Sequence, residues 1–236
     1  QSLRNVKATK IGIIFGANSE KHIETIKKAL PNNADITLIK RPNGEPKEEE
    51  ILKKSQELKE KDIDCLIALG GGSTIDFSKL CWALIENPSL TIEEIIKPFS
   101  ITKRESAQFI AIPTLFGSGA EASSAATFTK AGQSNKSIAL SHTFIPDQVI
   151  LDSLLASDIP QELIISGIFD ALTHAIEGYV SPIQNDLVKK YTFETIKLLV
   201  EELDNISNQK PTTLESLDNI AYASYWAGII QNHCST

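Results

Sequence analysis

The stretch CLIALGGGSTIDFSKL, residues 65–80, decides the fold class. Its first five residues are all apolar, which is typical of a β-strand buried on both faces. Three glycines and Ser73 follow as a turn, and the sequence then predicts a helix from about Thr74 to Ile85. A strand, a glycine turn and a helix in this order form the repeating unit of a parallel sheet covered by helices.

The same alternation continues on both sides of this stretch. Further strands are predicted at residues 10–15, 35–39, 109–113 and 148–151. Helices are predicted at about residues 23–30 and at residues 47–61, where the helix is rich in charge. Strands that alternate with helices indicate an α/β fold with a parallel sheet.

The pattern changes near Pro160. From residue 161 onward the apolar residues follow helical spacing, with predicted helices at residues 163–179, 186–203 and 214–230. We therefore expect two domains: an α/β domain over residues 1–160 and the first part of an all-helical domain over residues 161–236.

Composition excludes several functional classes. The 236 residues carry a net charge of −7, so nucleic acid and anionic membranes are not expected partners. No apolar stretch approaches the roughly 18 residues of a membrane-spanning helix, and the first residues lack the apolar core of a secretory signal. We expect a cytoplasmic protein whose Cys65, Cys81 and Cys234 are reduced thiols. Because the sequence has no methionine, we interpret it as part of a longer protein.

The glycine turn is the first candidate site. Gly71, Gly72 and Ser73 stand between a buried strand and a helix, and Asp76 follows in the first turn of that helix. Residues without side chains let a phosphate approach backbone N–H groups at the positive end of the helix dipole. A tight strand-to-helix turn uses glycine in the same way, so both interpretations stay open at this point.

A second glycine-rich loop, PTLFGSGAEA, spans residues 113–122 after another predicted strand. It formally satisfies the dinucleotide pattern G-x-G-x-x-A. However, it lies far from the first strand, and no acidic residue ends a strand about 20 residues later. We interpret it as a polar loop at the edge of the sheet where open α/β sheets bind ligands.

The third candidate lies within a predicted helix. Asp170 and His174 are four residues apart, so their side chains project from one helix face and could chelate one divalent metal. An aspartate that merely pairs with a histidine would have the same spacing. Glu177, one turn further on, is expected to face solvent.

Four segments together carry a family resemblance: GGGSTIDFSK, IPTLFGSGAE, IPDQVILD and DALTHAIEGYVS, in this order. The chain from about residue 64 to its end resembles the iron-containing (group III) alcohol dehydrogenases. The resemblance implies a Rossmann-like N-terminal dinucleotide-binding domain and an all-helical C-terminal domain, which is incomplete here. It also implies NAD or NADP and a divalent metal, iron or zinc, in the cleft between the domains.

The resemblance assigns roles by position. Gly71, Gly72, Ser73 and Asp76 would line the pyrophosphate and its neighbourhood. Thr114 and Ser118 match threonines of the family's P-T-T-x-G-T loop and would contact the diphosphate and nicotinamide side. Lys136 matches a cofactor-contacting lysine, although by itself it is one surface lysine among many. Leu155 would pack against the adenine or belong to the core. Asp170 and His174 match the first two metal ligands.

The sequence also departs from the family pattern. Leu115 and Phe116 replace smaller residues of the family loop, so the fit of substrate or nicotinamide is expected to differ. The first strand ends at Phe15 without the acid that holds an adenosine ribose, which favours NADP.

The metal site is incomplete in this sequence. Asn232 occupies the family's asparagine position, so the third metal ligand would be position 239, beyond residue 236. His233 is therefore interpreted as a helix residue beside the site, and His22 and His142 as surface or turn residues.

The sequence thus predicts a metal-dependent, NAD(P)-linked oxidoreductase that interconverts an alcohol and an aldehyde or ketone by hydride transfer. We nominate no general base. A small alcohol or aldehyde is the expected substrate, and a homo-oligomer the expected assembly. The alternatives are an enzyme related to glycerol dehydrogenase or dehydroquinate synthase, and a nucleotide-binding fragment without catalysis.

Overall fold

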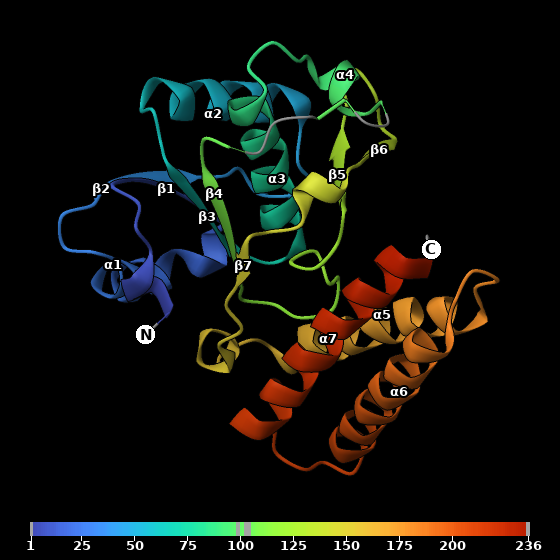
Figure 1. The fold of residues 1–236 in the computed structure, drawn as a ribbon. Helices are drawn as coiled ribbons and strands as arrows, with labels where there is room; N and C mark the ends of the chain where they lie inside the picture. Colours follow the sequence, from blue (N-terminus) through green and yellow to red (C-terminus); the bar gives the residue numbers. More distant parts are fainter. Residues whose placement is uncertain (1, 98–99, 102–104, 235–236) are drawn as a thin grey trace. The chain divides into compact units, whose positions relative to one another are not determined.

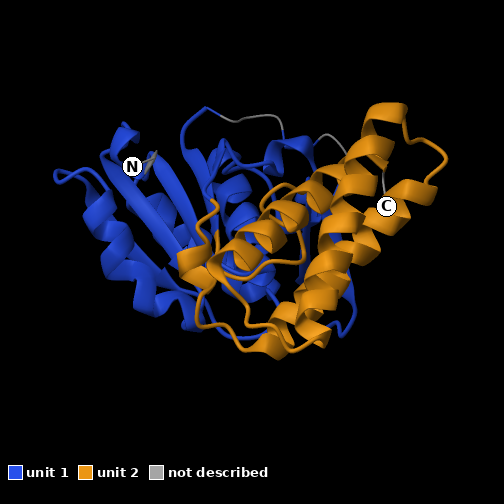
Figure 2. Cartoon of the chain, turned by 90° about the horizontal axis from the view of Figure 1, so that it is seen from below, with its two compact units in different colours: residues 1–112, 124–150 blue, residues 113–123, 151–236 orange. Residues whose placement is uncertain are grey.

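A computed structural model describes residues 2–97, 100–101 and 105–234 of the chain (Figure 1). The chain divides into two compact units, coloured separately in Figure 2. The first unit contains residues 1–112 and 124–150, and the second contains residues 113–123 and 151–236. The domain assignment drawn from the sequence, 1–160 and 161–236, stays a prediction.

The first unit is built on a sheet with the strand order β2-β1-β3-β4-β7. β1 pairs in parallel with both β2 and β3, and β4 pairs in parallel with β7, which confirms the α/β prediction. The strands are β1 (Lys10–Phe15), β2 (Asp35–Lys40), β3 (Cys65–Gly70), β4 (Gln108–Pro113) and β7 (Gln148–Val149).

Helices cover both faces of this sheet. They are α1 (Ile23–Ala29), α2 (Glu48–Glu60) and α3 (Gly72–Glu86); the short α4 (Ile92–Ile95) follows α3 in the chain. The chain moves from β1 to β2 in one direction and from β2 to β3 in the other. Right-handed crossovers therefore place α1 on the opposite face from α2, which packs on α3 (Figure 1). Every residue of β3 is buried as a result.

The sequence analysis did not predict the antiparallel hairpin of β5 (Ala125–Thr129) and β6 (Lys136–Leu140). The sequence signal that could have revealed it is the run Thr127-Phe128-Thr129, because threonine and phenylalanine are enriched in strands. Gly132, in the connecting turn, has a φ of +71°, a conformation that favours glycine.

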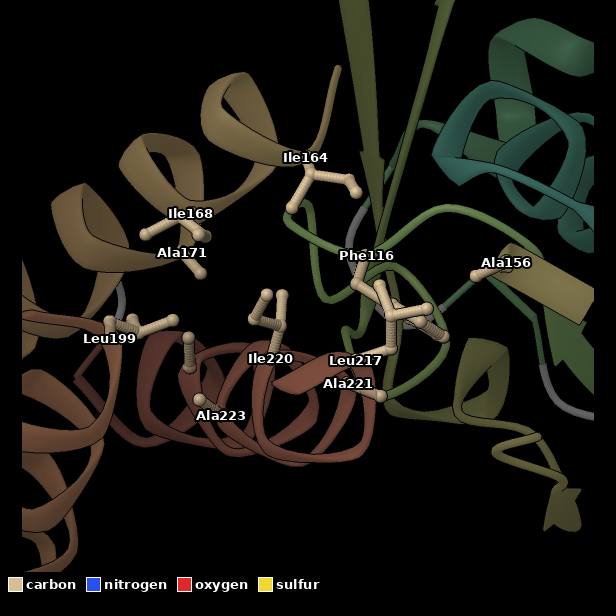
Figure 3. Packing of buried hydrophobic residues seen from close by; sticks show 11 residues of the cluster. Phe116, Ala156, Ile164, Ile168, Ala171, Leu199, Leu217, Ile220, Ala221 and Ala223 are labelled. Atoms are coloured by element: carbon tan, nitrogen blue, oxygen red, sulfur yellow. The ribbon is translucent and has the colours of Figure 1, made fainter. Parts of the chain in front are cut away.

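The second unit contains the predicted helices, observed as α5 (Gln161–Val180), α6 (Asp186–Ser207) and α7 (Leu214–Cys234). Each of them packs against the other two. A short 3₁₀ helix, η4 (Ser153–Ala156), contacts α7. Most of the buried apolar side chains of these helices belong to the core cluster shown in Figure 3, and Val188, Ile230 and Cys234 form a second, smaller cluster.

Helix α5 is, among the described residues, the helix that is long and apolar enough to cross a membrane by length and composition alone. The sequence analysis recognised no such segment. Helices in the core of soluble proteins meet the same criterion, so this is weak support for a membrane span.

The three cysteines are free and buried. Burial raises the pKa of Cys65 to about 12, and it also raises the pKa of Cys81. Both thiols are therefore protonated at neutral pH and unreactive. That the three thiols are reduced stays a prediction.

Asp64 leads to a testable prediction about acid stability. Its carboxylate accepts hydrogen bonds from the backbone N–H of Thr9 at 2.8 Å and of Lys10 at 2.9 Å, and from the Thr9 hydroxyl at 2.9 Å. Burial raises the pKa of Asp64, but these hydrogen bonds outweigh it and leave the pKa lowered. A depressed pKa in the folded state stabilises the protein above the unfolded pKa of about 3.9.

We therefore expect Asp64→Asn to lower the urea midpoint of unfolding at pH 7. The difference from wild type should shrink as the pH falls through the folded pKa of Asp64, where the wild-type carboxylate also takes up a proton. The exposed Glu49→Gln on α2 serves as the control. An equal difference at pH 7 and in strong acid would contradict the prediction.

Candidate functional site

The glycine turn joins β3 directly to α3. Gly71 is the N-cap of α3 in an extended conformation, and the helix begins at Gly72. A Cβ on Gly70 would lie 2.7 Å from the side-chain oxygen of Thr74, so the turn requires glycine at this position. The first backbone hydrogen bonds of the helix run from Thr74 N–H and Ile75 N–H to the Gly71 carbonyl.

This geometry leaves the N-terminus of α3 suited to an anion. Within the described chain, no side chain caps the helix, and the N–H groups of Gly72 and Ser73 precede its first hydrogen bonds. The turn follows β3, and β3 lies next to β1 in the sheet. Between these two strands the chain's direction of progress across the sheet reverses, since β2 lies on one side and β4 on the other. Open α/β sheets bind ligands outside the carboxyl ends of their strands at such a point. A helix N-terminus there favours phosphate.

Asp76 faces the β5–β6 hairpin. Its Oδ2 atom accepts hydrogen bonds from the Thr127 backbone N–H at 3.0 Å and from the Thr127 hydroxyl at 2.8 Å. Burial raises the pKa of Asp76, whereas Lys79 and Thr127 act in the opposite direction. In the structure Asp76 therefore fastens the hairpin to α3, and its contact with a pyrophosphate stays a prediction.

Lys79 is a buried cation that the sequence analysis did not single out. Its Nζ atom donates to the Ala125 carbonyl at 2.7 Å and lies 3.9 Å from Asp76 Oδ1. The signal that could have found it is a lysine three residues after an aspartate in an otherwise apolar helix. Lys79 and Asp76 thus hold the same hairpin from one helix face.

Lys136 and Leu155 differ in exposure. Lys136, the first residue of β6, is exposed, and its Nζ atom lies 2.9 Å from Glu45 Oε1. Leu155 is buried within η4. The predicted roles of both residues in binding a cofactor remain predictions.

The glycine-rich loop of residues 113–123 belongs to the second unit. Thr114 is buried, and Ser118 is half-buried with its hydroxyl accepting the Ala120 N–H at 3.3 Å. Gly119 has a φ of +59°, which is the left-handed region.

Phe116 anchors this loop in the core of the second unit. Its side chain is 4% exposed and lies between Ile164 of α5 and Leu217 of α7 (Figure 3). The expectation that Leu115 and Phe116 alter the fit of substrate or nicotinamide stays a prediction. In the structure the Phe116 ring is a hydrophobic anchor, because the loop turns this side chain toward the helices.

Asp170 and His174 lie on one face of α5, as their spacing predicts. His174 Nε2 is 3.9 Å from Asp170 Oδ1, and the side chains are 17% and 51% exposed respectively. His174 Nδ1 is buried and has no hydrogen-bond partner among the described residues. The Nε2 atom and the partly exposed Asp170 carboxylate beside it fit part of the donor set of a divalent metal.

The part of the chain that the structure describes contains no group of three or more His, Cys, Asp or Glu residues that could hold a metal. His233 is exposed, and its Nδ1 atom lies 3.0 Å from the Ile229 carbonyl of its own helix. Glu177 is exposed as well. Asp170 and His174 are therefore the candidate metal donors within the described part of the chain.

Two family models match this sequence. Residues 1–153 match "Iron-containing alcohol dehydrogenase", and residues 164–236 match "Fe-containing alcohol dehydrogenase family, C-terminal". The chain belongs to the iron-containing alcohol dehydrogenase family. This confirms the resemblance found in the sequence.

Individual members of the iron-containing alcohol dehydrogenase family agree with this assignment. An NADPH-dependent butanol dehydrogenase from Clostridium saccharobutylicum is 28% identical over 240 residues, which cover 97% of this chain and 62% of that protein. An alcohol dehydrogenase from Thermococcus barophilus is 31% identical over 212 residues, 87% of this chain and 54% of that protein. The chain thus spans about three fifths of the length of such relatives.

A solved iron-containing alcohol dehydrogenase has the same fold. The enzyme from Thermococcus thioreducens superposes with a TM-score of 0.85 at 27% identity, over 96% of this chain and 61% of that chain. The predicted fold class, an α/β part followed by a helical part, is confirmed.

Proposed function

We propose that this chain carries the dinucleotide-binding part and half of the metal site of an oxidoreductase that interconverts an alcohol and an aldehyde or ketone. The observation that carries the proposal is the uncapped N-terminus of α3, which follows a glycine turn at the reversal point of the sheet in a chain of the iron-containing alcohol dehydrogenase family. The relatives, named butanol dehydrogenase and alcohol dehydrogenase, support the same reaction class.

In this proposal two glycine-rich segments, residues 70–73 and residues 113–122, contribute to cofactor binding. The N–H groups of Gly72 and Ser73 bind the pyrophosphate, and Gly71 lets it approach the backbone. Thr114 and Ser118 hold the nicotinamide side. The other residues proposed to contact the cofactor are Asp76, Lys136 and Leu155.

Asp170 and His174 are proposed to hold a divalent metal, iron or zinc. When bound, such a metal polarises the substrate oxygen and stabilises negative charge on it. The contribution of α5 is to present the carboxylate and the imidazole on one face. We assign no residue as the general acid or base that transfers the proton of the alcohol hydroxyl.

NADPH is the proposed cofactor. β1 ends at Phe15 without an acidic residue, and Phe15 is paired with Lys40, the last residue of β2. The family acid that binds the adenosine ribose would stand at the end of β1, and its replacement there leaves room for a 2′-phosphate. The similarity to a protein named NADPH-dependent butanol dehydrogenase supports this choice.

A small alcohol or aldehyde is the proposed substrate. The net charge of −7 supports the prediction that nucleic acid is not a partner. The homo-oligomeric assembly and the cytoplasmic location stay predictions. An enzyme related to glycerol dehydrogenase or dehydroquinate synthase is not favoured, since both family models describe iron-containing alcohol dehydrogenases.

Gly72→Val tests the pyrophosphate site. A branched side chain at the first residue of α3 would occupy the space in which the phosphate must approach. We expect at least about a tenfold loss in NADPH affinity, about 1.4 kcal/mol, measured by fluorescence titration. Wild type should also bind NADPH at least about tenfold more tightly than NADH.

Gly132→Ala in the β5–β6 turn is the control, because its added Cβ meets no atom within 4 Å. Unchanged affinity of Gly72→Val for both dinucleotides would defeat the pyrophosphate assignment. Tighter binding of NADH than of NADPH would reverse the choice of cofactor. If wild type binds NADPH but the protein that contains this chain reduces no aldehyde, the non-catalytic alternative is favoured.

A further inference from the structure

Three residues of α7, spaced four apart, contact the loop of residues 113–123. Ser224, Gly228 and Asn232 share one helix face because of this spacing. The fully buried Ser224 hydroxyl accepts the N–H of Gly117 at 2.7 Å. Asn232 Nδ2 donates to the Ala122 carbonyl at 2.5 Å. The loop is thus hydrogen-bonded to α7 at its middle and near its C-terminal end.

Between these two hydrogen bonds the backbones approach closely. A Cβ on Gly119 would lie 2.6 Å from the Cα of Gly228, and a Cβ on Gly228 would overlap the Gly119 carbonyl oxygen. Side chains at either position would push the loop away from α7. This region of α7 therefore accepts the loop in one position only.

Helix α5 holds the other side of the same loop. A Cβ on Gly117 would lie 2.6 Å from the Cα of Gly167, and a Cβ on Gly167 would overlap the Phe116 carbonyl oxygen. Gly167 precedes Asp170 by three residues and His174 by seven on this helix. The helix that carries the proposed metal ligands thus also fixes the loop.

We propose that Ser224 and Asn232 are positioning residues, which hold Thr114 and Ser118 in a fixed relation to Asp170 and His174. This inference rests on the proposed function, in which the loop binds the nicotinamide side of the cofactor. The hydrogen bonds to α7 and the buried Phe116 ring order the loop before the cofactor arrives. Ordering a flexible backbone costs conformational entropy, so a preformed loop raises affinity.

The test compares two probes that differ in the nicotinamide. NADPH carries it, whereas 2′-phospho-ADP-ribose keeps the adenosine and the pyrophosphate and lacks it. Ser224→Ala leaves the Gly117 N–H without its acceptor, and Asn232→Ala removes the donor to Ala122. We expect each variant to lose about tenfold in NADPH affinity, a change of about 1.4 kcal/mol, and to bind 2′-phospho-ADP-ribose as wild type does.

Asn219→Ala is the matched control. It removes a 2.7 Å hydrogen bond from the same helix to Glu202 of α6, a contact outside the loop. We expect Asn219→Ala to lower the melting temperature of the protein without a selective loss of affinity for NADPH. Hydrogen exchange of the peptide that contains Gly117 should rise in Ser224→Ala and stay unchanged in Asn219→Ala.

Each outcome decides the inference. A selective loss of NADPH affinity in Ser224→Ala and Asn232→Ala, together with unchanged binding by Asn219→Ala, supports it. Equal losses for both probes, or no loss for either, overturn it while the proposed function stands. A wild-type chain that binds neither probe overturns the proposed function, and the inference fails with it.

Discussion

His174→Ala is expected to lower kcat/KM for aldehyde reduction by at least about 100-fold in the protein that contains this chain. The substitution removes one of the two donors that α5 presents to a metal. Charge stabilisation by a bound metal contributes several kcal/mol to a transition state, and each 1.36 kcal/mol corresponds to about tenfold in rate. NADPH affinity should stay within about twofold of wild type, a change of less than about 0.5 kcal/mol, because the proposed pyrophosphate contacts are on α3.

Metal analysis beside steady-state assays checks this result. His142→Ala serves as the control, since His142 is exposed in the 3₁₀ segment His142–Phe144. The control should keep both metal and activity. A His174→Ala protein with stoichiometric metal and full turnover would refute the site. The isolated 236-residue chain should hold metal weakly, because two donors do not fill a tetrahedral or octahedral site.

Gly167→Val is expected to destabilise the helical unit by about 3 kcal/mol or more. The backbone of α5 at Gly167 lies directly against the Phe116 carbonyl, so a Cβ at Gly167 would overlap that oxygen. Because the overlapping atom belongs to the backbone, no rotation of a side chain relieves the clash. Either α5 or the loop must move, and the Phe116 ring then leaves the core that it shares with Ile164 and Leu217.

Urea denaturation followed by circular dichroism measures this effect. Gly132→Val is the matched control, since it adds the same side chain where nothing lies within 4 Å, although its φ of +71° brings some strain. We expect the control to cost about 1–2 kcal/mol through that strain alone. Equal unfolding midpoints for the two variants would show that the contact between Gly167 and Phe116 does not constrain the fold.

The local pattern of apolar residues and glycines was sufficient to predict the main helices and strands. The apolar run of residues 65–69 and the glycines after it predicted a buried strand, a turn and a helix, observed as β3 and α3. Helical spacing from residue 161 onward predicted α5, α6 and α7 within a few residues of their observed ends. Spacing also placed Asp170 and His174 on one face of α5. These predictions succeeded because each depends on neighbours within two helical turns.

Tertiary structure decided the features that join distant parts of the chain. Gly117 meets Ser224 across 107 positions of sequence, and Asp76 meets Thr127 across 51. Neither pair leaves a periodic pattern in the sequence. The grouping of residues 113–123 with the helices, and the role of Asp76 in holding the β5–β6 hairpin, therefore became visible only in the folded chain.

For His174, some properties follow from the sequence and others only from the tertiary structure. The sequence by itself determined the helix, the face shared with Asp170 and the resemblance to a metal-binding family. Only the tertiary structure decided that Nδ1 is buried without a hydrogen-bond partner among the described residues. The physical reason is that burial depends on which elements pack around the imidazole, and packing between elements is set by non-local contacts that local spacing does not encode.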